Sequence, residues 1–268
     1  MADIDFKERY GPWAIIAGGS EGVGEAFAHE LAKRGLNLLL AARKPDPLEN
    51  LAGTIRRQYG KEVRTLAIDL TDAFAVQRLV DASSGCEVGM LVYNAGADNK
   101  VRDFIERPLE ESQRMIALNV LTPMSLVRVL APSMAGRRRG GIILLSSFAS
   151  TVGTPGNLVY AATKAFSNIF AEGLWYELGA QGVHVLGLII GITQTPAMER
   201  MGLKFTGLKV PADPYDLVEE ALKHIDKGPT LHAGGTLGDA TRLRSLPRDQ
   251  AVREIAGFSS AVRRNPIS

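Results

Sequence analysis

The stretch that decides the fold runs from Ile142-Ile-Leu-Leu-Ser-Ser147 to Tyr160-Ala-Ala-Thr-Lys164. Its apolar run has the length of a buried strand, and a loop with glycine and proline leads to a helical segment. Tyr160 and Lys164 are four residues apart, so a helix places them on one face. Because a neighbouring ammonium favours the phenolate, this spacing predicts a general acid and base at Tyr160. An ordinary surface pair is the alternative, since the same spacing often arises by chance.

A glycine-rich motif near the N-terminus supplies the second signal. The apolar run Trp13-Ala-Ile-Ile-Ala17 precedes Gly18-Gly-Ser-Glu-Gly22-Val-Gly24, and a helical pattern continues to Gly35. Glycines let a pyrophosphate approach the backbone, and a helix N-terminus favours its negative charge. The motif therefore predicts a dinucleotide cradle. Its candidate cofactor-binding residues are Gly18, Ser20, Gly22, Val23 and Gly24.

The same loop has a second interpretation from another class of enzyme. Gly18-Gly-Ser20-Glu-Gly22 also fits the Gly-x-Ser-x-Gly nucleophile elbow of serine hydrolases, which stands between a strand and a helix. A hydrolase normally places several strands before its nucleophile, and few residues precede Ser20 here. Hydrolysis is thus the weaker alternative.

The serine, tyrosine and lysine together resemble the classical short-chain dehydrogenase/reductase family. In that family a serine ending the fifth strand holds the substrate oxygen and the tyrosine exchanges its proton. The lysine lowers the tyrosine pKa and binds the nicotinamide ribose. The resemblance assigns these roles to Ser147, Tyr160 and Lys164. It adds Asn119, where a local helix distortion would hold a water that links Lys164 to solvent.

Three further segments match the family in order. Asp69-Leu-Thr-Asp72 resembles its adenine-contacting Asp-Val-Thr-Asp, although Asp69 or Thr71 alone would be interpreted as a helix cap. Tyr93-Asn94-Ala-Gly96 resembles Asn-Asn-Ala-Gly, and Gly191-Ile-Thr193-Gln-Thr195 resembles a nicotinamide loop in which Ile190 replaces a proline. The resemblance implies cofactor contacts from Asp69, Leu70, Asn94, Ala95, Gly96, Tyr160, Lys164, Gly191, Thr193 and Thr195.

The end of the second strand bears on the choice of nicotinamide cofactor. An acidic residue there binds the ribose 2′-hydroxyl of NAD, whereas an arginine attracts the 2′-phosphate of NADP. Ala42 stands at the acid position and Arg43 follows, which favours NADP. Glu21 lies where some NADP-dependent relatives carry a basic residue, so NAD stays an alternative. A solvated Arg43 is the plainer interpretation.

Alternating apolar strands and amphipathic helices predict an α/β fold, a doubly wound Rossmann-type parallel sheet of about seven strands in a single domain. The domain spans residues 1–268, with a core at 13–232, a substrate loop at 192–212 and a C-terminal extension at 236–268. The extension is rich in arginine and is interpreted as a solvated terminal helix, with contact to a partner subunit or an acidic surface as the alternative. Expected strands lie at 13–17, 36–42, 63–69, near 90, 142–147, 183–190 and 230–232. Expected helices include 47–59 and 108–134.

Composition limits the partners. The formal net charge of +2 gives no sign of a nucleic-acid surface, so a small molecule is the expected partner. Cys86 is the only cysteine and the four histidines are scattered, so we expect no metal. No signal-peptide core and no membrane-length apolar run are evident, which makes the cytoplasm the expected location. Related enzymes are commonly homodimers or homotetramers.

These observations predict an oxidoreductase that moves a hydride between NADP(H) and a ketone or secondary alcohol. Phe148, Leu158 and Met198, with Val152, Met201, Leu203 and Phe205, would line an apolar substrate pocket, although core packing explains them equally well. The alternative from another class is a cofactor-binding regulator or scaffold that kept the fold and lost turnover. The substrate itself is not specified by these motifs.

Overall fold

Uninterrupted burial marks the central strands, as expected of a parallel sheet covered on both faces. Every residue of β1 (Trp13–Ala17) and of β4 (Val88–Tyr93) is buried. The computed structural model, which describes residues 3–98, 100–196, 198 and 210–263, contains one sheet of seven parallel strands in the order β3-β2-β1-β4-β5-β6-β7. The other strands are β2 (Asn37–Ala42), β3 (Val63–Ala67), β5 (Gly141–Ser147), β6 (His184–Ile190) and β7 (Thr230–His232). The predicted fold class is confirmed.

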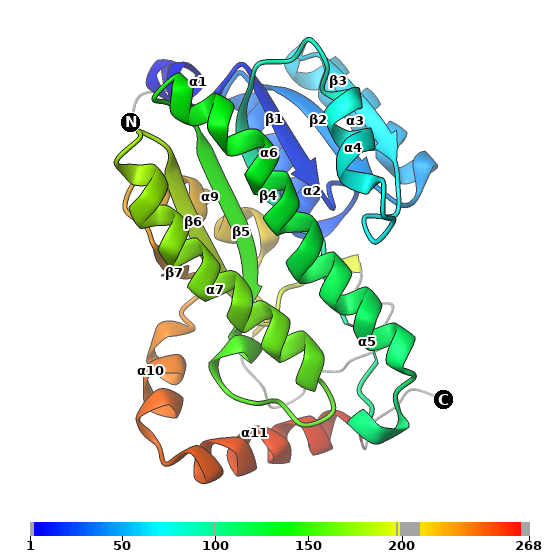
Figure 1. Cartoon of the computed structure of the whole chain (residues 1–268), viewed down its shortest axis with the longest axis vertical. Helices are drawn as coiled ribbons and strands as arrows, with labels where there is room; N and C mark the ends of the chain where they lie inside the picture. The colour runs from blue at the N-terminus through cyan, green and yellow to red at the C-terminus, as the bar shows by residue number, and fades with distance from the viewer. Residues whose placement is uncertain (1–2, 99, 197, 199–209, 264–268) are drawn as a thin grey trace.

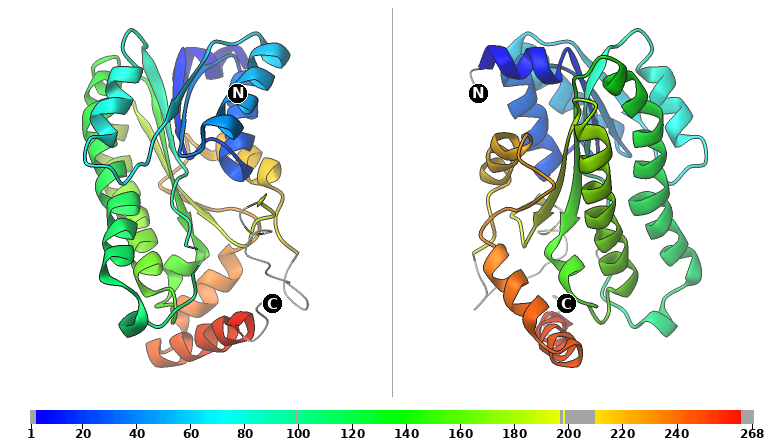
Figure 2. Two further views of the ribbon diagram at one scale, coloured as in Figure 1. Left: turned by 90° about the vertical axis from the view of Figure 1, so that its right-hand side faces the viewer. Right: turned by 60° about the vertical axis from the view of Figure 1, so that its left-hand side comes forward.

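Helices cover both faces of the sheet, as Figures 1 and 2 show. Side chains alternate between the two faces along each strand, so Ile16 packs in one core and Ile15 in the other. The first core lies under α2 (Gly22–Lys33), α3 (Pro45–Tyr59) and α9 (Pro214–His224). The second lies under α4 (Ala75–Ala82), α6 (Thr122–Gly136) and α7 (Leu158–Gly179). A short α1 (Asp3–Tyr10) precedes β1.

The long helix expected at 108–134 is interrupted. It consists of α5 (Leu109–Ile116), a π-helical turn (Ala117–Leu121) and α6. By length and composition Leu109–Gly136 could cross a bilayer, but 44% of its apolar window is buried inside the protein. Packing against the sheet accounts for the buried part of its apolar side chains, whereas Leu121, Met124 and Val129 are exposed.

The C-terminal extension differs from the solvated helix that the sequence suggested. It forms α10 (Leu237–Ser245) and α11 (Arg248–Arg263), which lie below the carboxyl ends of the strands in Figure 1. Leu243 and Ala251 are buried there in a small apolar cluster with Val152, which follows β5. The arginines of this segment predict exposure to solvent, but its apolar residues pack against Val152.

Candidate active site

The predicted catalytic residues meet at the carboxyl ends of the strands. Strand order reverses between β1 and β4, and in open α/β sheets this reversal opens a ligand crevice. Ser147 is the last residue of β5. Tyr160 and Lys164 lie in the first turns of α7, which packs against β5. The topology thus brings together residues that are separated in sequence by a loop.

Tyr160 is half-buried, and Ser147 is close enough to act on its phenol. Burial raises the pKa of the Tyr160 phenol; the Ser147 side chain opposes this, and the Asp98 carboxylate adds to it. The direction is opposite to the lowered pKa that the lysine spacing predicted. The physical reason is that the cost of removing the phenolate from water exceeds the stabilisation that the Ser147 side chain provides. The phenol therefore favours its protonated form.

The Lys164 ammonium is buried and faces the strand end. Its Nζ donates a hydrogen bond to the Leu145 carbonyl oxygen at 2.9 Å and lies 5.8 Å from the centre of the Tyr160 ring. The Ser146 hydroxyl donates to the Lys164 carbonyl oxygen at 2.8 Å, which fixes α7 against β5. Burial lowers the pKa of Lys164 to about 8, so its charge is retained at neutral pH.

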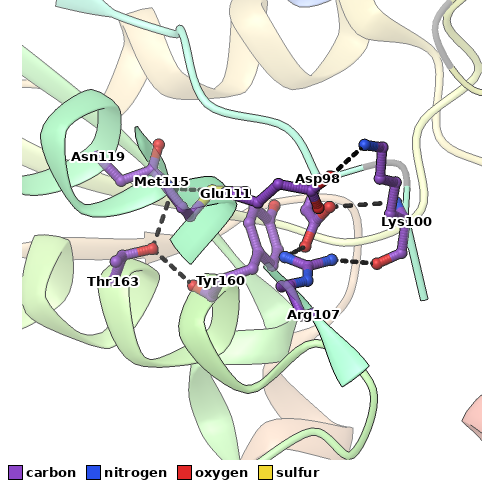
Figure 3. Close-up of polar contacts among 8 residues, drawn as sticks. All are labelled: Asp98, Lys100, Arg107, Glu111, Met115, Asn119, Tyr160 and Thr163. Carbon is purple, nitrogen blue, oxygen red and sulfur yellow. Dashed lines mark hydrogen bonds and ion pairs between the residues drawn. The ribbon is translucent and has the colours of Figure 1, made fainter. Parts of the chain in front are cut away.

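Asn119 lies in the π-helical turn, where the family resemblance implied a helix distortion. Its carboxamide nitrogen donates to Thr163 Oγ1 at 2.9 Å, and that hydroxyl donates to the Tyr160 carbonyl oxygen at 2.9 Å (Figure 3). Asn119 Oδ1 is buried without a hydrogen-bond partner among the described residues. A cavity of about 10 Å³ between Asn119 and Lys164 is near the lower limit for one water molecule.

Tyr93 holds the π-helical turn, a role that the sequence did not reveal. Its hydroxyl donates to the Leu118 carbonyl oxygen at 2.6 Å, and burial raises its pKa, so it stays a donor. Tyr93 replaces the first Asn of the family motif. The substitution itself was the available signal, because a tyrosine buried at a strand end needs a partner for its hydroxyl.

The glycine loop is shaped by close backbone approaches. A Cβ on Gly24 would overlap the Gly18 carbonyl oxygen, and one on Gly22, whose φ is +59°, would lie 2.9 Å from Thr195 Cγ2. Asn94 Nδ2 donates to the Gly18 carbonyl oxygen at 2.7 Å. These contacts leave backbone, not side chains, facing the crevice at the start of α2. The loop thus fits the pyrophosphate of a nicotinamide dinucleotide.

The other predicted cofactor residues lie around the same crevice. Gly96 lies directly against two of the predicted catalytic residues. A Cβ at this position would overlap Asn119 Oδ1 and lie 3.2 Å from Lys164 Nζ. Val23, Leu70 and Thr193 are buried, and Thr193 Oγ1 donates to the Gly191 carbonyl oxygen at 3.1 Å. The half-exposed residues of the set are Ser20, Asp69, Asn94, Ala95, Gly96, Gly191 and Thr195.

Asp69 is already engaged. Its carboxylate accepts from the Thr71 backbone N–H at 2.9 Å and lies 2.8 Å from the Arg114 guanidinium. Burial opposes ionisation, but the hydrogen bonds from Thr71 and Arg114 prevail and lower the pKa of Asp69 to about 2. Neither Asp69 nor Thr71 caps a helix, because α4 begins later, at Ala75. The capping interpretation is wrong.

Arg43 is exposed directly after β2. The glycine loop is attached to this strand end, since the Gly18 backbone N–H donates to the Ala41 carbonyl oxygen at 2.8 Å. Arg43 therefore stands beside the cradle. Among the described residues it has no ion-pair partner, so its guanidinium is available to a ligand.

The substrate side is described in part. Phe148 and Val152 belong to one apolar cluster, whereas Leu158 is 44% exposed at the start of α7. The backbone N–H of Met198 donates to Thr195 Oγ1 at 3.3 Å. Met201, Leu203 and Phe205 lie outside the described residues, as does most of the substrate loop predicted at 192–212. The packing of α10 and α11 against Phe148 and Val152 was missed from the sequence.

The rival groups lack supporting geometry. No hydrogen bond joins Ser20 to a histidine or carboxylate in the part of the chain that the structure describes. Burial raises the pKa of the Cys86 thiol, so it is not a reactive thiolate. The described residues contain no group of three metal-ligating side chains.

Residues 12–204 match the family model of short chain dehydrogenases. The chain belongs to this family. Among curated members, it is 30% identical to the mouse very-long-chain 3-oxoacyl-CoA reductase, over 95% of this chain and 82% of the relative. It is 32% identical to the 7beta-hydroxysteroid dehydrogenase of Clostridium sardiniense, over 86% of this chain and 88% of the relative. These short-chain relatives are named as enzymes of alcohol and carbonyl groups.

Solved structures of short-chain dehydrogenases give the same result. A structure from a study of 7beta-hydroxysteroid dehydrogenase stereoselectivity superposes with a TM-score of 0.86 at 28% identity, covering 93% of this chain and 98% of that one. A short-chain dehydrogenase from Sphingobium yanoikuyae in complex with NADPH superposes with a TM-score of 0.76 at 28% identity, covering 96% and 98%. The chain is therefore an oxidoreductase of a family that uses a nicotinamide cofactor.

Proposed function

We propose that this chain is an NADP(H)-dependent reductase of ketones, reversible toward secondary alcohols, with Tyr160 as the acid and base. The observation that carries the proposal is that the centre of the Tyr160 ring lies 5.8 Å from the buried Lys164 ammonium, at the end of β5 where Ser147 stands. A phenol whose pKa is raised is protonated at neutral pH, so it can donate a proton. That state suits reduction of a carbonyl group.

Each side chain then has a distinct task. The bound nicotinamide supplies the hydride donor in reduction and the acceptor in oxidation. Ser147 holds the substrate oxygen within reach of the phenol and stabilises the negative charge that develops on it. Tyr160 delivers its proton to that oxygen. Lys164 lowers the cost of the resulting phenolate, and Asn119 holds α7 in register through Thr163.

The preference for NADP rests on Arg43. Its exposed guanidinium follows β2, at the strand end to which the glycine loop is hydrogen-bonded. Arginine pairs with phosphate oxygens in a bidentate geometry, so Arg43 would recognise the 2′-phosphate. The NADPH complex of the Sphingobium relative is consistent with this preference.

The substrate we propose is an apolar ketone or alcohol. Phe148 and Val152, with α10 and α11, place an apolar cluster next to Ser147. The names of the two curated relatives describe substrates with a large apolar body and an oxo or hydroxy group. Phe148, Leu158 and Met198 stay the candidate substrate contacts.

We further propose that the enzyme works as a homo-oligomer and without a membrane span or nucleic acid. Large apolar side chains are exposed on the outer surface of α6 and α7, the two helices that run side by side in Figure 1. They include Met124, Val129, Ile169, Trp175 and Tyr176. Exposed apolar groups on two helices that cover the same face of the sheet favour association. A cytoplasmic location stays a prediction.

The decisive experiment compares Tyr160→Phe with Tyr215→Phe, a matched change at a tyrosine that is 45% exposed on α9. Wild type is screened with NADPH against steroid ketones, 3-oxoacyl thioesters and aryl ketones by absorbance at ~340 nm. Tyr160→Phe should lower kcat at least about 100-fold while NADPH binding persists. Normal turnover by Tyr160→Phe would refute the role of Tyr160. A wild-type protein that binds NADPH but turns over none of the substrates would favour the scaffold alternative.

A further inference from the structure

A buried ion pair spans the segment that follows β4. Asp98 Oδ2 lies 2.7 Å from Arg107 Nη1, and the two side chains are only 4% and 5% exposed. The pair is reinforced within the segment, because the Lys100 backbone N–H donates to Asp98 Oδ1 at 3.1 Å and Arg107 donates to the Lys100 carbonyl oxygen. Buried charges are costly unless each remains paired, so this arrangement ties Asp98 to Lys100 and Arg107.

The segment lies over Tyr160. Figure 3 shows Asp98 and Arg107 beside the Tyr160 ring. The Arg102 backbone N–H donates to the Gly156 carbonyl oxygen at 3.0 Å, which attaches the segment to the loop before α7. The negative charge of Asp98 is close enough to raise the pKa of the phenol. The ion pair thus fixes the segment in place and also puts a charge near the Tyr160 phenol.

Other charged groups around the phenol are arranged differently. Lys100 and Glu111, which lies in α5, form a second ion pair at 2.6 Å. Their side chains are 52% and 29% exposed, so solvent screens this pair more than the Asp98–Arg107 pair, although Glu111 Oε2 is itself buried without a hydrogen-bond partner among the described residues. Arg102 is exposed. Lys164 of α7 faces Leu145. Among the described residues, Asp98 is therefore the buried anion that faces Tyr160, and Arg107 is the cation that balances it.

We propose that the Asp98–Arg107 pair is a positioning device for Tyr160: it fixes the segment over the phenol, and the Arg107 guanidinium keeps the buried Asp98 charge from locking the phenol in its protonated form. The inference rests on the proposed role of Tyr160 as the proton donor. It makes a prediction that a purely structural clamp does not. Neutralising either partner must move the Tyr160 titration, and the two shifts must have opposite signs.

The test uses Asp98→Asn, Arg107→Gln and the double variant, with the full chain labelled with ¹³C at tyrosine Cζ. Tyr160→Phe identifies the resonance of Tyr160. Asp98→Asn leaves a positive charge near the phenol and should lower its pKa by roughly one unit or more. Arg107→Gln leaves a negative charge and should raise it, so that Tyr160 stays protonated to the highest pH at which the protein is folded. The double variant should return close to wild type.

Glu111→Gln is the matched control, because it removes a nearby carboxylate that pairs with Lys100 and is not among the groups that shift the Tyr160 pKa; it should move the Tyr160 titration much less. Shifts of the same sign in the two single variants, or no shift in either, would overturn the proposal. If Arg107→Gln does not fold, Asp98→Asn and the double variant still decide: a lowered pKa that returns in the double variant supports the proposal, and an unchanged pKa contradicts it.

The pH dependence of turnover gives a second readout. Alcohol oxidation needs the deprotonated phenol, so its acid limb should move down in Asp98→Asn and up in Arg107→Gln. If wild type turns over no substrate, the proposed function fails, whereas the tyrosine titration still tests the ion pair. If turnover is present and the acid limb does not move in either variant, the inference fails and the proposed function stands.

Discussion

The Lys164 ammonium donates to the carbonyl oxygen of Leu145, two residues before the serine that ends β5. The positive charge of Lys164 is thereby buried at the end of β5, next to Ser147. The contact satisfies one N–H of the ammonium, but burial still lowers the Lys164 pKa to about 8. Lysine at this position is therefore expected to reduce stability while serving the reaction.

Lys164→Met should separate these two effects. Below about pH 8 the folded state buries a charged ammonium; between about pH 8 and 10.5 the unfolded state binds more protons, so this cost falls as pH rises. The variant should thus unfold with a free energy roughly 1–2 kcal/mol higher than wild type at pH 7, after the lost hydrogen bond is subtracted. Urea unfolding at pH 7 and at ~9.5 measures this, and the gain should shrink at the higher pH. Turnover should be lost at both pH values; a variant less stable at pH 7 contradicts the argument.

Gly24→Ala should damage the cofactor cradle. Its Cβ would overlap the Gly18 carbonyl oxygen and lie 2.8 Å from Asn94 Nδ2, so either the loop or α2 must shift. We expect a loss of roughly 1–3 kcal/mol in stability and weaker binding of either nicotinamide cofactor. Gly136→Ala is the control, because no atom lies within 4 Å of its Cβ at the end of α6. Thermal unfolding and fluorescence titration compare the pair, and equal behaviour would show that the loop is not closely packed.

Arg43→Ala should weaken NADPH binding and spare NADH binding. Loss of a charge-assisted hydrogen bond of ~1.5–3 kcal/mol corresponds to roughly 10- to 100-fold in affinity. Arg78→Ala, at an exposed arginine on α4, controls for the change in net charge. Fluorescence titration with each cofactor is the measurement. Tighter binding of NADH than NADPH by wild type would reverse the proposed preference.

Ile169→Glu should disrupt the proposed oligomer. Ile169 is 68% exposed on α7, and burial of such a residue in an interface does not tolerate a carboxylate. Ile105→Glu is the control, because Ile105 is 93% exposed in the turn before α5, away from the outer surface of α6 and α7. Light scattering after size exclusion should show a monomer only for the first variant. A monomeric wild type would end the proposal.

Local signals made much of this fold predictable. The glycine loop, the strands around it and the helix that carries Tyr160 and Lys164 were all located from residues adjacent in sequence, and the structure has β1, β5 and α7 there. A helix distortion at Asn119 followed from the family resemblance, and the structure has a π-helical turn there. Propensity alone would have given an unbroken helix from Pro108 to Met134.

What the sequence did not reveal depends on tertiary contacts. Asp98 and Arg107 stand nine residues apart in a loop without periodicity, so nothing indicated that both are buried. The raised pKa of Tyr160 depends on how much water the surrounding segments exclude, which spacing to Lys164 does not report. The packing of α10 and α11 was not expected, because their many arginines predict exposure and the sequence does not show that the apolar face of each helix is covered.

The π-helical turn makes this helix sensitive to the deletion of a single residue. Such a turn holds one residue more than an α-helical turn, so Leu109–Gly136 is equivalent to a regular helix with a single insertion. Deleting one residue, such as Leu118, would leave both flanking helices in phase with the sheet while rotating Asn119 away from Thr163. Loss of one codon would then produce a folded descendant without the Asn119–Thr163 hydrogen bond, which is a short evolutionary path by which the proposed role of Asn119 could be lost.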